Sequence, residues 1–189
     1  MEERKPSTLP SPAGRGLSGG FTLIELMTCL AVIVVLTAWG VPAFGALARD
    51  AARTREVNQF IQGVYLARSE AIKRNDVVSL CPSLDGSTCS PSAAWQSGWL
   101  VFVNDDGDSP AIRDAGEELL RVYPEWDRGH ISANRTTLSF RPFGQVGVTA
   151  TVTFCDDRGS AAARAVIISQ TGRPRVSSRS ASGSALTCT

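Results

Sequence analysis

The chain has 189 residues, a formal net charge of +1, five cysteines and a single histidine. A charge so close to zero excludes a nucleic-acid binder that relies on its overall charge, so only a local basic segment could bind nucleic acid. One histidine, His130, and no C-x-x-C pair leave no basis for a Ser-His-Asp site, a Cys-His site or a zinc cluster. We interpret His130 as a loop or edge residue and predict no enzyme, no metal and no cofactor.

The N-terminal region places a polar segment before an apolar one. Residues 1–20 are rich in Pro, Ser and Gly and end in Gly19-Gly20, whereas Phe21–Phe44 is apolar with one charge, Glu25. About 20 apolar residues span a bilayer as a helix. A secretory signal has its small residues after the apolar stretch, not before it. Cleavage after Gly20 would retain the apolar segment and create an α-amino group on Phe21, four residues from Glu25.

The helix is expected to continue through residues 45–75, with a kink at Pro42, because proline removes a backbone donor and clashes with the preceding turn. Apolar residues recur there at spacings of three and four, which predicts an amphipathic helix with one buried face. They are Leu47, Val57, Phe60, Ile61, Val64, Ala67, Ala71 and Ile72. The intervening positions are polar: Arg53, Arg55, Glu56, Gln59, Gln62, Arg68 and Glu70. Lys73 and Arg74 suit a helix C-terminus, and Asn75-Asp76 provides a stop.

Residues 76–189 are predicted to form a β-rich domain, because apolar or alternating runs are separated by turn residues. The runs are Val77–Cys81, Trp99–Val103, Leu119–Tyr123, Thr136–Phe140, Val146–Phe154 and Arg164–Gln170. The whole is α+β: a long N-terminal helix packed against an antiparallel sheet.

Four cysteines lie in this β-rich domain, and Cys29 lies in the apolar segment. Four cysteines in an exported domain suggest two disulfides, for which three connectivities are possible. Proximity in the sequence favours Cys81–Cys89 and Cys155–Cys188.

The string SGGFTLIELM at residues 18–27 resembles the processing site and N-terminal helix of type IV pilins and type II secretion pseudopilins. LARSEAIKRN, VVSLCPSLDGSTC and WQSGWLVFVNDDGD further along resemble the GspH/FimT subgroup of minor subunits. The resemblance implies that residues 1–20 are a prepilin leader peptide and that a prepilin peptidase cleaves after Gly20 and N-methylates Phe21. It implies that Glu25 pairs with a neighbouring subunit's amino terminus. It also implies a single pass through the inner membrane with a periplasmic domain, and a place in a pilus on the cell surface after assembly.

Residues 104–118 contain a cluster of acids that is partly similar to a calcium loop, but the EF-hand pattern does not fit in register. We interpret this segment as a solvated hairpin or Asx-turn loop. Trp126 and Tyr123 could be buried or exposed.

The C-terminal part, from Arg158 to Thr189, contains five arginines and no Asp or Glu. Gly172-Arg173-Pro174-Arg175 matches a G-R-x-R motif that resembles the one in FimT-type minor pilins, which bind DNA during natural transformation. The resemblance assigns phosphate contacts to Arg173 and Arg175, with Gly172 allowing close approach of the backbone. Charge alone adds Arg179 and, less strongly, Lys73 and Arg74. A solvated tail without a ligand is the alternative interpretation.

The sequence therefore predicts a minor type IV pilin whose C-terminal arm, about residues 171–189, binds DNA without sequence specificity. The arm is expected to be mobile yet tethered by Cys155–Cys188. Three engaged arginines would give a slope near −3 for log K against log salt concentration. The main alternative is a structural minor pseudopilin of a type II secretion system or a pilus-priming complex that binds no DNA. An adhesin that uses exposed aromatics has less support.

Overall fold

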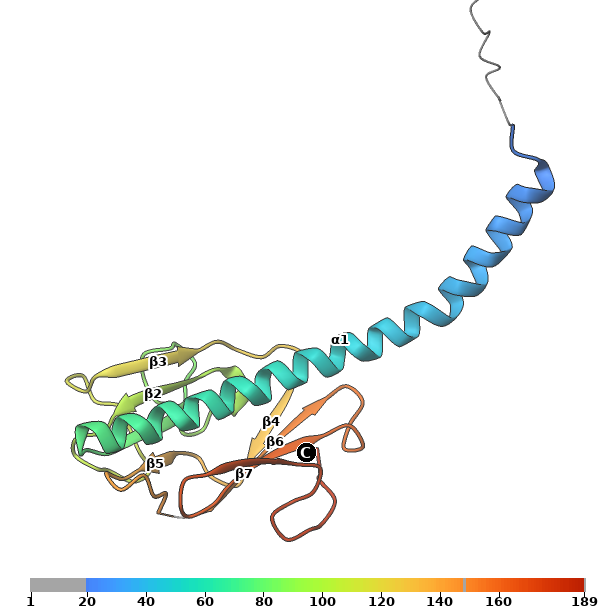
Figure 1. Cartoon of the computed structure of the whole chain (residues 1–189). Helices are drawn as coiled ribbons and strands as arrows, with labels where there is room; N and C mark the ends of the chain where they lie inside the picture. The colour runs from blue at the N-terminus through green and yellow to red at the C-terminus, as the bar shows by residue number, and fades with distance from the viewer. Residues whose placement is uncertain (1–19, 148, 189) are drawn as a thin grey trace, which may run out of the picture. The chain divides into compact units, whose positions relative to one another are not determined.

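The computed structural model describes residues 20–147 and 149–188; of residues 41–43 it describes the backbone only. The predicted leader, apart from Gly20, lies outside the described residues. The chain divides into two compact units, Met1–Phe44 and Gly45–Thr189, which are described separately. Helix α1, Leu23–Arg74, runs through both units (Figure 1). The kink expected at Pro42 stays a prediction.

The described part of the N-terminal unit is the first half of α1, which begins at a threonine cap. The backbone N–H of Glu25 donates to Oγ1 of Thr22 at 3.3 Å, as in the first half of a capping box. The apolar side chains that follow are exposed, and this stretch passes the length and hydropathy test for a membrane span. The hydroxyl of Thr37 donates to the Ile33 carbonyl of its own helix, which suits an apolar surrounding. The N-terminal apolar helix is therefore a candidate membrane anchor.

In the C-terminal unit, the second half of α1 packs on the sheets through a stripe with spacings of three and four. The stripe consists of Val57, Phe60, Val64, Ala67 and Ala71, all buried. Two apolar residues that we predicted for this face are exposed instead: Leu47 at 64% and Ile72 at 48%. Both lie off the stripe, whereas Arg53, predicted among the polar positions, lies on it and is 5% exposed.

The helix ends as the sequence predicted. Asn75 adopts a left-handed conformation with a φ of 55°, and the N–H of Asp76 donates to the Ala71 carbonyl at 3.2 Å. This is a Schellman motif, in which asparagine replaces the usual glycine.

Two four-stranded antiparallel sheets complete the unit, and the α+β class is confirmed. The first has the order β3-β2-β1-β5 and the second the order β4-β6-β7-β8. The first sheet contains β1 (Val78–Pro82), β2 (Trp99–Val103), β3 (Leu119–Tyr123) and β5 (Leu138–Phe140). The second contains β4 (Gly129–Ala133), β6 (Ala150–Asp156), β7 (Arg164–Ile168) and β8 (Pro174–Ser177). A 3-10 turn, η1 (Trp95–Ser97), precedes β2.

The predicted strands β2 and β3 have the predicted bounds, and three others are shorter than predicted. The run from Val146 forms strand only from Ala150 onward. Strands β4 and β8 were not predicted, because each is an edge strand with few apolar residues to show a pattern. His130 lies on the edge strand β4, in agreement with its interpretation as a loop or edge residue.

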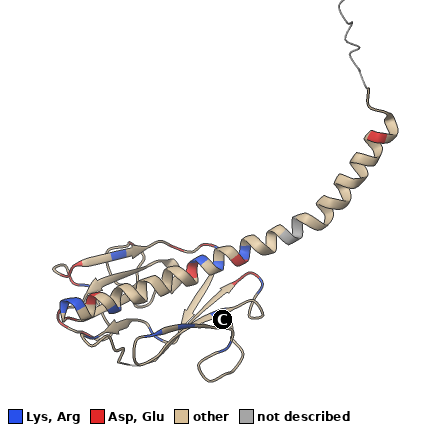
Figure 2. Ribbon diagram, viewed as in Figure 1, with Lys and Arg blue, Asp and Glu red and all other residues tan. Residues whose placement is uncertain are grey.

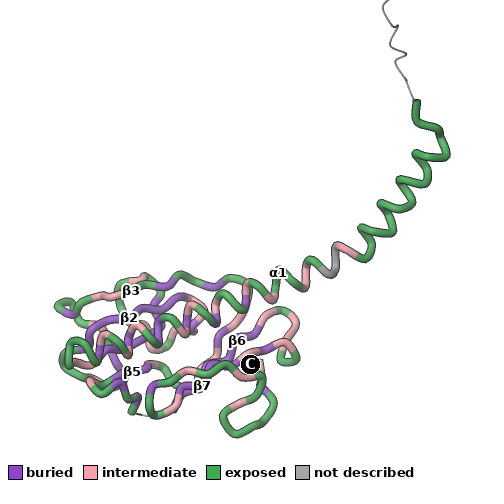
Figure 3. The backbone as a smooth tube through the Cα atoms, viewed as in Figure 1, coloured by how far each residue is buried: buried purple, intermediate pink, exposed green. Residues whose placement is uncertain are grey.

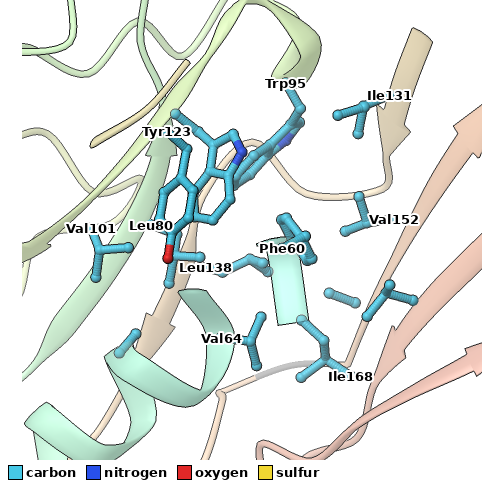
Figure 4. Close-up of a cluster of buried hydrophobic side chains, with 14 of the residues drawn as sticks. Phe60, Val64, Leu80, Trp95, Val101, Tyr123, Ile131, Leu138, Val152 and Ile168 are labelled. Carbon is cyan, nitrogen blue, oxygen red and sulfur yellow. The ribbon is translucent and has the colours of Figure 1, made fainter. Parts of the chain in front are cut away.

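The buried residues of the core come from α1 and both sheets (Figure 3). Their side chains include several aromatic rings (Figure 4). The ring centroid of Phe60 lies 5.3 Å from that of Trp99 and 5.7 Å from that of Phe154. Tyr123 stacks on Trp99 at 3.7 Å, and both Tyr123 and Trp126 are buried. These two aromatics are therefore not available to an adhesive surface.

Two disulfides brace the β-rich unit, and the pairing that proximity favoured is confirmed. Cys81 is bonded to Cys89 across the segment between β1 and η1, and Cys155 of β6 is bonded to Cys188. Cys29 is an exposed free cysteine.

Candidate nucleic-acid interface

The predicted arginine arm is a hairpin and an edge strand, not a mobile loop. Residues 170–172 form a three-residue loop closed by Ser169 and Arg173: the N–H of Gly172 donates to the Ser169 carbonyl at 2.8 Å, and that of Ser169 to the Arg173 carbonyl at 3.1 Å. Gly172 has a φ of 71°, the left-handed conformation that closes such loops. Strand β8 then pairs with β7, with Arg175 opposite Ile167. The expectation of a mobile arm is therefore wrong for Pro174–Ser177, because backbone ladder bonds hold this segment.

The loop between β5 and β6 has the same construction. The N–H of Gly144 donates to the Arg141 carbonyl at 2.7 Å, the N–H of Arg141 donates to the Gln145 carbonyl at 3.0 Å, and Gly144 has a φ of 68°. Phe143 occupies the middle of this loop. We call residues 142–144 the Phe143 turn and residues 169–175 the GRPR hairpin.

These two turns pack directly against each other. A β-carbon at position 172 would overlap the carbonyl oxygen of Gly144. The N–H of Val146 donates to the Gln170 carbonyl at 3.0 Å, and Nε of Arg68 donates to the same Gly144 carbonyl at 3.1 Å. The close approach that Gly172 permits is therefore to Gly144, which corrects the expectation that it serves a ligand; Gly172 is itself buried.

Arg173 and Arg175 present uncommitted guanidinium groups. Both residues are exposed, and within residues 20–147 and 149–188 neither side chain donates a hydrogen bond or joins an ion pair. Their backbones are fixed by the hairpin and by Pro174. The geometry therefore offers two cationic forks on an ordered edge, which is the arrangement that recognises phosphate oxygens.

The weaker candidates from the sequence are engaged elsewhere. Arg74 donates two bonds to Glu118, at 2.6 and 3.1 Å, and one to Glu70, which also pairs with Lys73. Arg74 holds the pKa values of Glu70 and Glu118 below their usual range. Arg179 follows the far end of β8 and donates to the Gly183 carbonyl of its own loop at 3.0 Å. Arg173 and Arg175 thus lie two positions apart on the hairpin without side-chain partners among the described residues, whereas these three cations are bonded to other groups.

Two other arginines of the C-terminal run are structural. Arg158 donates to Asp156 and Asp50, and Arg164 donates to nearby carbonyls. Arg53 of α1 also donates to Asp50 and Asp156, and we call these four side chains (Asp50, Arg53, Asp156 and Arg158) the charge cluster. The bonds from Arg158, above all, lower the pKa values of both aspartates. Figure 2 shows the alternation of acidic and basic residues along this part of α1.

Two residues beside the hairpin were not identified from the sequence as site candidates. Arg68 was treated as one polar position of the amphipathic helix, and Phe143 was not considered. Only the contact between the Phe143 turn and the GRPR hairpin relates them to Arg173. Phe143 is followed by a glycine and preceded by a proline, which is a turn signal but no functional one.

The acidic segment 104–118 is organised by a buried side chain. The carboxylate of Glu117, 4% exposed, accepts backbone N–H bonds from Asp105 and Asp114. Burial raises its pKa. In this segment a carboxylate accepts hydrogen bonds from backbone N–H groups of the same loop. In the described part of the chain no group of three or more His, Cys, Asp or Glu is arranged to hold a metal ion.

At the other end of the chain, Gly20 and Phe21 are exposed and precede the Thr22 cap. Glu25 lies in the first turn of α1, where the helix dipole favours a carboxylate. A favourable interaction with the helix dipole therefore accompanies any role in assembly.

Comparison with known protein families identifies the family of this chain. The family described as type II transport protein GspH matches residues 56–172, more than half of the chain. The chain belongs to the GspH family. Members are minor pilins and pseudopilins, structural subunits that associate with other pilins, and the chain is not an enzyme. The match ends at Gly172, so Arg173 and Arg175 lie just outside it.

Two crystal structures of the type IV minor pilin FimU from Pseudomonas aeruginosa share the fold of this GspH-family chain. One has 20% sequence identity and a TM-score of 0.50 and covers 74% of this chain and 98% of its own. The other has 19% identity and a TM-score of 0.53 and covers 77% and 99%. A comparison with curated proteins gives no match. At such identities the likeness concerns the fold alone.

Proposed function

We propose that this GspH-family chain is a FimT-like minor type IV pilin that binds extracellular DNA through Arg173 and Arg175 for uptake in natural transformation. The observation that carries the proposal is the pair of exposed, unpaired guanidinium groups on an ordered edge hairpin. In a chain of net charge +1, two such groups are a local site. Bonds to phosphate oxygens give affinity without sequence preference. Several subunits in one pilus raise a weak affinity through avidity.

The proposal includes a route to the pilus. A prepilin peptidase cleaves between Gly20 and Phe21 and N-methylates Phe21, and the apolar helix holds the subunit in the inner membrane with its β-rich unit in the periplasm. Glu25 then pairs with the amino terminus of a neighbouring pilin during assembly. The exposed position of both cleavage residues and the single carboxylate in an apolar helix support this route.

A second function is favoured by a different observation. Pro174 and Arg175 lie on an edge strand, where proline and charged residues prevent unwanted strand pairing. On that basis the chain is a structural minor pseudopilin of a type II secretion system or pilus-priming complex, and its arginines bind no DNA.

The binding test uses the full mature chain in a non-ionic detergent and a fluorescent duplex of about 30 base pairs at low salt. We expect Arg173→Gln with Arg175→Gln to lower affinity at least about tenfold. The matched control is Arg128→Gln with Arg135→Gln, which removes the same charge from two other exposed arginines without a side-chain partner among the described residues and should leave affinity within about twofold. Absence of binding by the wild-type chain would exclude the DNA function. An equal loss of affinity in both double variants would show that binding depends on net charge and not on Arg173 and Arg175.

The assembly test separates the charge of Glu25 from the rest of its side chain. The Thr22 cap uses the backbone N–H of residue 25, so both variants keep it. Glu25→Gln removes the charge alone, whereas Glu25→Ala removes the charge and the side chain. We expect both variants to be cleaved normally, as read by the mass of the N-terminal peptide, and both to be depleted from sheared pili. Normal incorporation of Glu25→Gln would contradict the pairing.

A further inference from the structure

We propose that the GRPR hairpin prefers single-stranded DNA, because Phe143 stacks on an unpaired base while Arg173 and Arg175 hold the adjoining phosphates. This inference rests on the proposed DNA-binding function and extends it to the class of DNA. The juxtaposition that carries it is the packing of the Phe143 turn against the GRPR hairpin.

Phe143 is the most exposed large apolar side chain of the described part of the C-terminal unit, at 84%. Nearly all the other aromatic rings of this unit lie in the core; Tyr65, on α1, is 51% exposed. A ring exposed to this extent leaves most of its surface available to a ligand, and it lies on a turn that packs against the hairpin carrying Arg173 and Arg175.

The ring is carried by a rigid turn. Two backbone hydrogen bonds between Arg141, Gly144 and Gln145 close the loop. The Gly144 carbonyl is held by Arg68 and contacts Gly172. A platform fixed in this way loses little conformational entropy when a ligand binds.

Arg68 has a positioning role in this arrangement. Its Nε donates to the Gly144 carbonyl, and its aliphatic stem lies against the backbone at Gly172. It is half-buried, and no ion pair among the described residues includes it. One side chain of α1 thus holds the turn that carries the ring against the hairpin that carries the cations.

The combination of an exposed ring and neighbouring guanidinium groups selects for unpaired bases. Single-strand binders combine cationic contacts to the backbone with aromatic rings on which bases stack, and the stacking is tolerant of sequence. In a duplex the base faces are already covered by their neighbours, and exposing one requires unstacking. The arginines therefore serve both forms of DNA, whereas Phe143 contributes to the single strand alone.

The alternative partner of Phe143 is a neighbouring pilin, because exposed apolar side chains also occur at protein interfaces. Ile72, 48% exposed, lies against the same turn and would enlarge such a contact. The uncommitted guanidinium groups on the adjoining hairpin favour the nucleic acid over a protein surface.

The test compares a 20-nucleotide single strand with its duplex, using the full mature chain in non-ionic detergent. We expect the wild type to bind the single strand more tightly. Phe143→Leu should lower single-strand affinity by roughly 5- to 100-fold, the range for one stacked base, and change duplex affinity less than about twofold. Phe143→Trp should restore single-strand binding. The control Leu84→Ala removes another exposed apolar side chain, on a different loop, and should have no effect.

A direct signal of stacking comes from 2-aminopurine placed in the single strand. Its fluorescence should be quenched by the wild type and by Phe143→Trp, and not by Phe143→Leu. Equal affinity for both forms of DNA with no effect of Phe143→Leu would overturn this inference and leave the proposed function intact. Loss of pilus incorporation by Phe143→Leu with unchanged single-strand affinity would assign Phe143 to a subunit interface. Absence of binding to either form would instead exclude the proposed function itself.

Discussion

Two groups of arginines in this chain differ in their partners. In the charge cluster, Arg53 and Arg158 are bonded to Asp50 and Asp156. In the GRPR hairpin, Arg173 and Arg175 have no acidic partner within residues 20–147 and 149–188. The C-terminal run of the sequence contains arginines of both groups, so the charge of a segment does not say which of its cations are available to a ligand.

The difference follows from burial. The side chain of Arg53 is 6% exposed and that of Asp156 is 4% exposed, and a charge removed from water to that extent requires a partner. The exposed guanidinium groups of the hairpin keep their water and need none. A phosphate can therefore bind to Arg173 or Arg175 without breaking a bond of the fold, whereas binding to Arg53 would compete with Asp50 and Asp156.

The largest expected effect tests the structural half of this comparison. Arg53→Ala should lower the free energy of unfolding by about 3 kcal/mol, because Oδ2 of the buried Asp156 and the Ala162 carbonyl each lose a donor and the buried stem of Arg53 loses its packing. Urea denaturation followed by tryptophan fluorescence measures this, since three of the tryptophans are in the core. Arg175→Ala, on the exposed hairpin, should change stability by less than about 0.5 kcal/mol. Equal losses would mean that the two groups do not differ in structural role.

The packing of the GRPR hairpin can be tested with two glycines of similar geometry. Gly172 and Gly183 both have positive φ values, 71° and 86°, in loops of the same construction. A β-carbon at Gly183 meets nothing within 4 Å, whereas one at Gly172 overlaps the Gly144 carbonyl. Gly183→Ala should cost about 1 kcal/mol for the backbone strain alone, and Gly172→Ala about 2–3 kcal/mol with added overlap. Similar losses would show that the two turns do not pack closely.

The sequence predicted the helix and most of the first sheet because their apolar residues form a clear pattern, either a helical period or a continuous run. Val57, Phe60 and Val64 repeat at the helical spacing, and Trp99–Val103 is a continuous apolar run. The edge strands β4 and β8 were not predicted, because Gly129–Ala133 and Pro174–Ser177 each contain only one large apolar residue. A half-paired strand needs no apolar pattern to be held in place.

The burial of Arg53 was predictable in hindsight from the same period. Arg53 precedes Val57 by four positions and Phe60 by seven, so it belongs to the buried stripe, and a charge on such a stripe implies an acidic partner. One such partner, Asp50, lies three positions earlier on the same helix, but the buried partner, Asp156, was not predictable because it lies more than a hundred residues away. The contact between the Phe143 turn and the GRPR hairpin was hidden for the same reason: no local pattern joins residues 144 and 172.

A smaller effect is expected when Arg173 of the GRPR hairpin is given an acidic neighbour, as the arginines of the charge cluster have. Thr171→Asp places a carboxylate next to Arg173 on the exposed loop. We expect DNA affinity to fall about fivefold at low salt, through competition for the guanidinium and repulsion of the phosphates. Thr171→Asn is the neutral control and should bind like the wild type, with both variants unfolding at the wild-type denaturant concentration. If Thr171→Asp binds as well as Thr171→Asn, Arg173 does not contact phosphate.

The salt dependence of duplex binding tests the central claim most directly. Each phosphate contact contributes about −0.9 to the slope of log K against log salt concentration. Because Arg179 lies at the far end of β8 and is bonded within its own loop, two contacts are expected in place of three. The wild-type chain should therefore show a slope near −2, and the variant with Arg173→Gln and Arg175→Gln a slope near zero. A slope in the double variant as steep as that of the wild type would contradict the assignment of DNA binding to the GRPR hairpin.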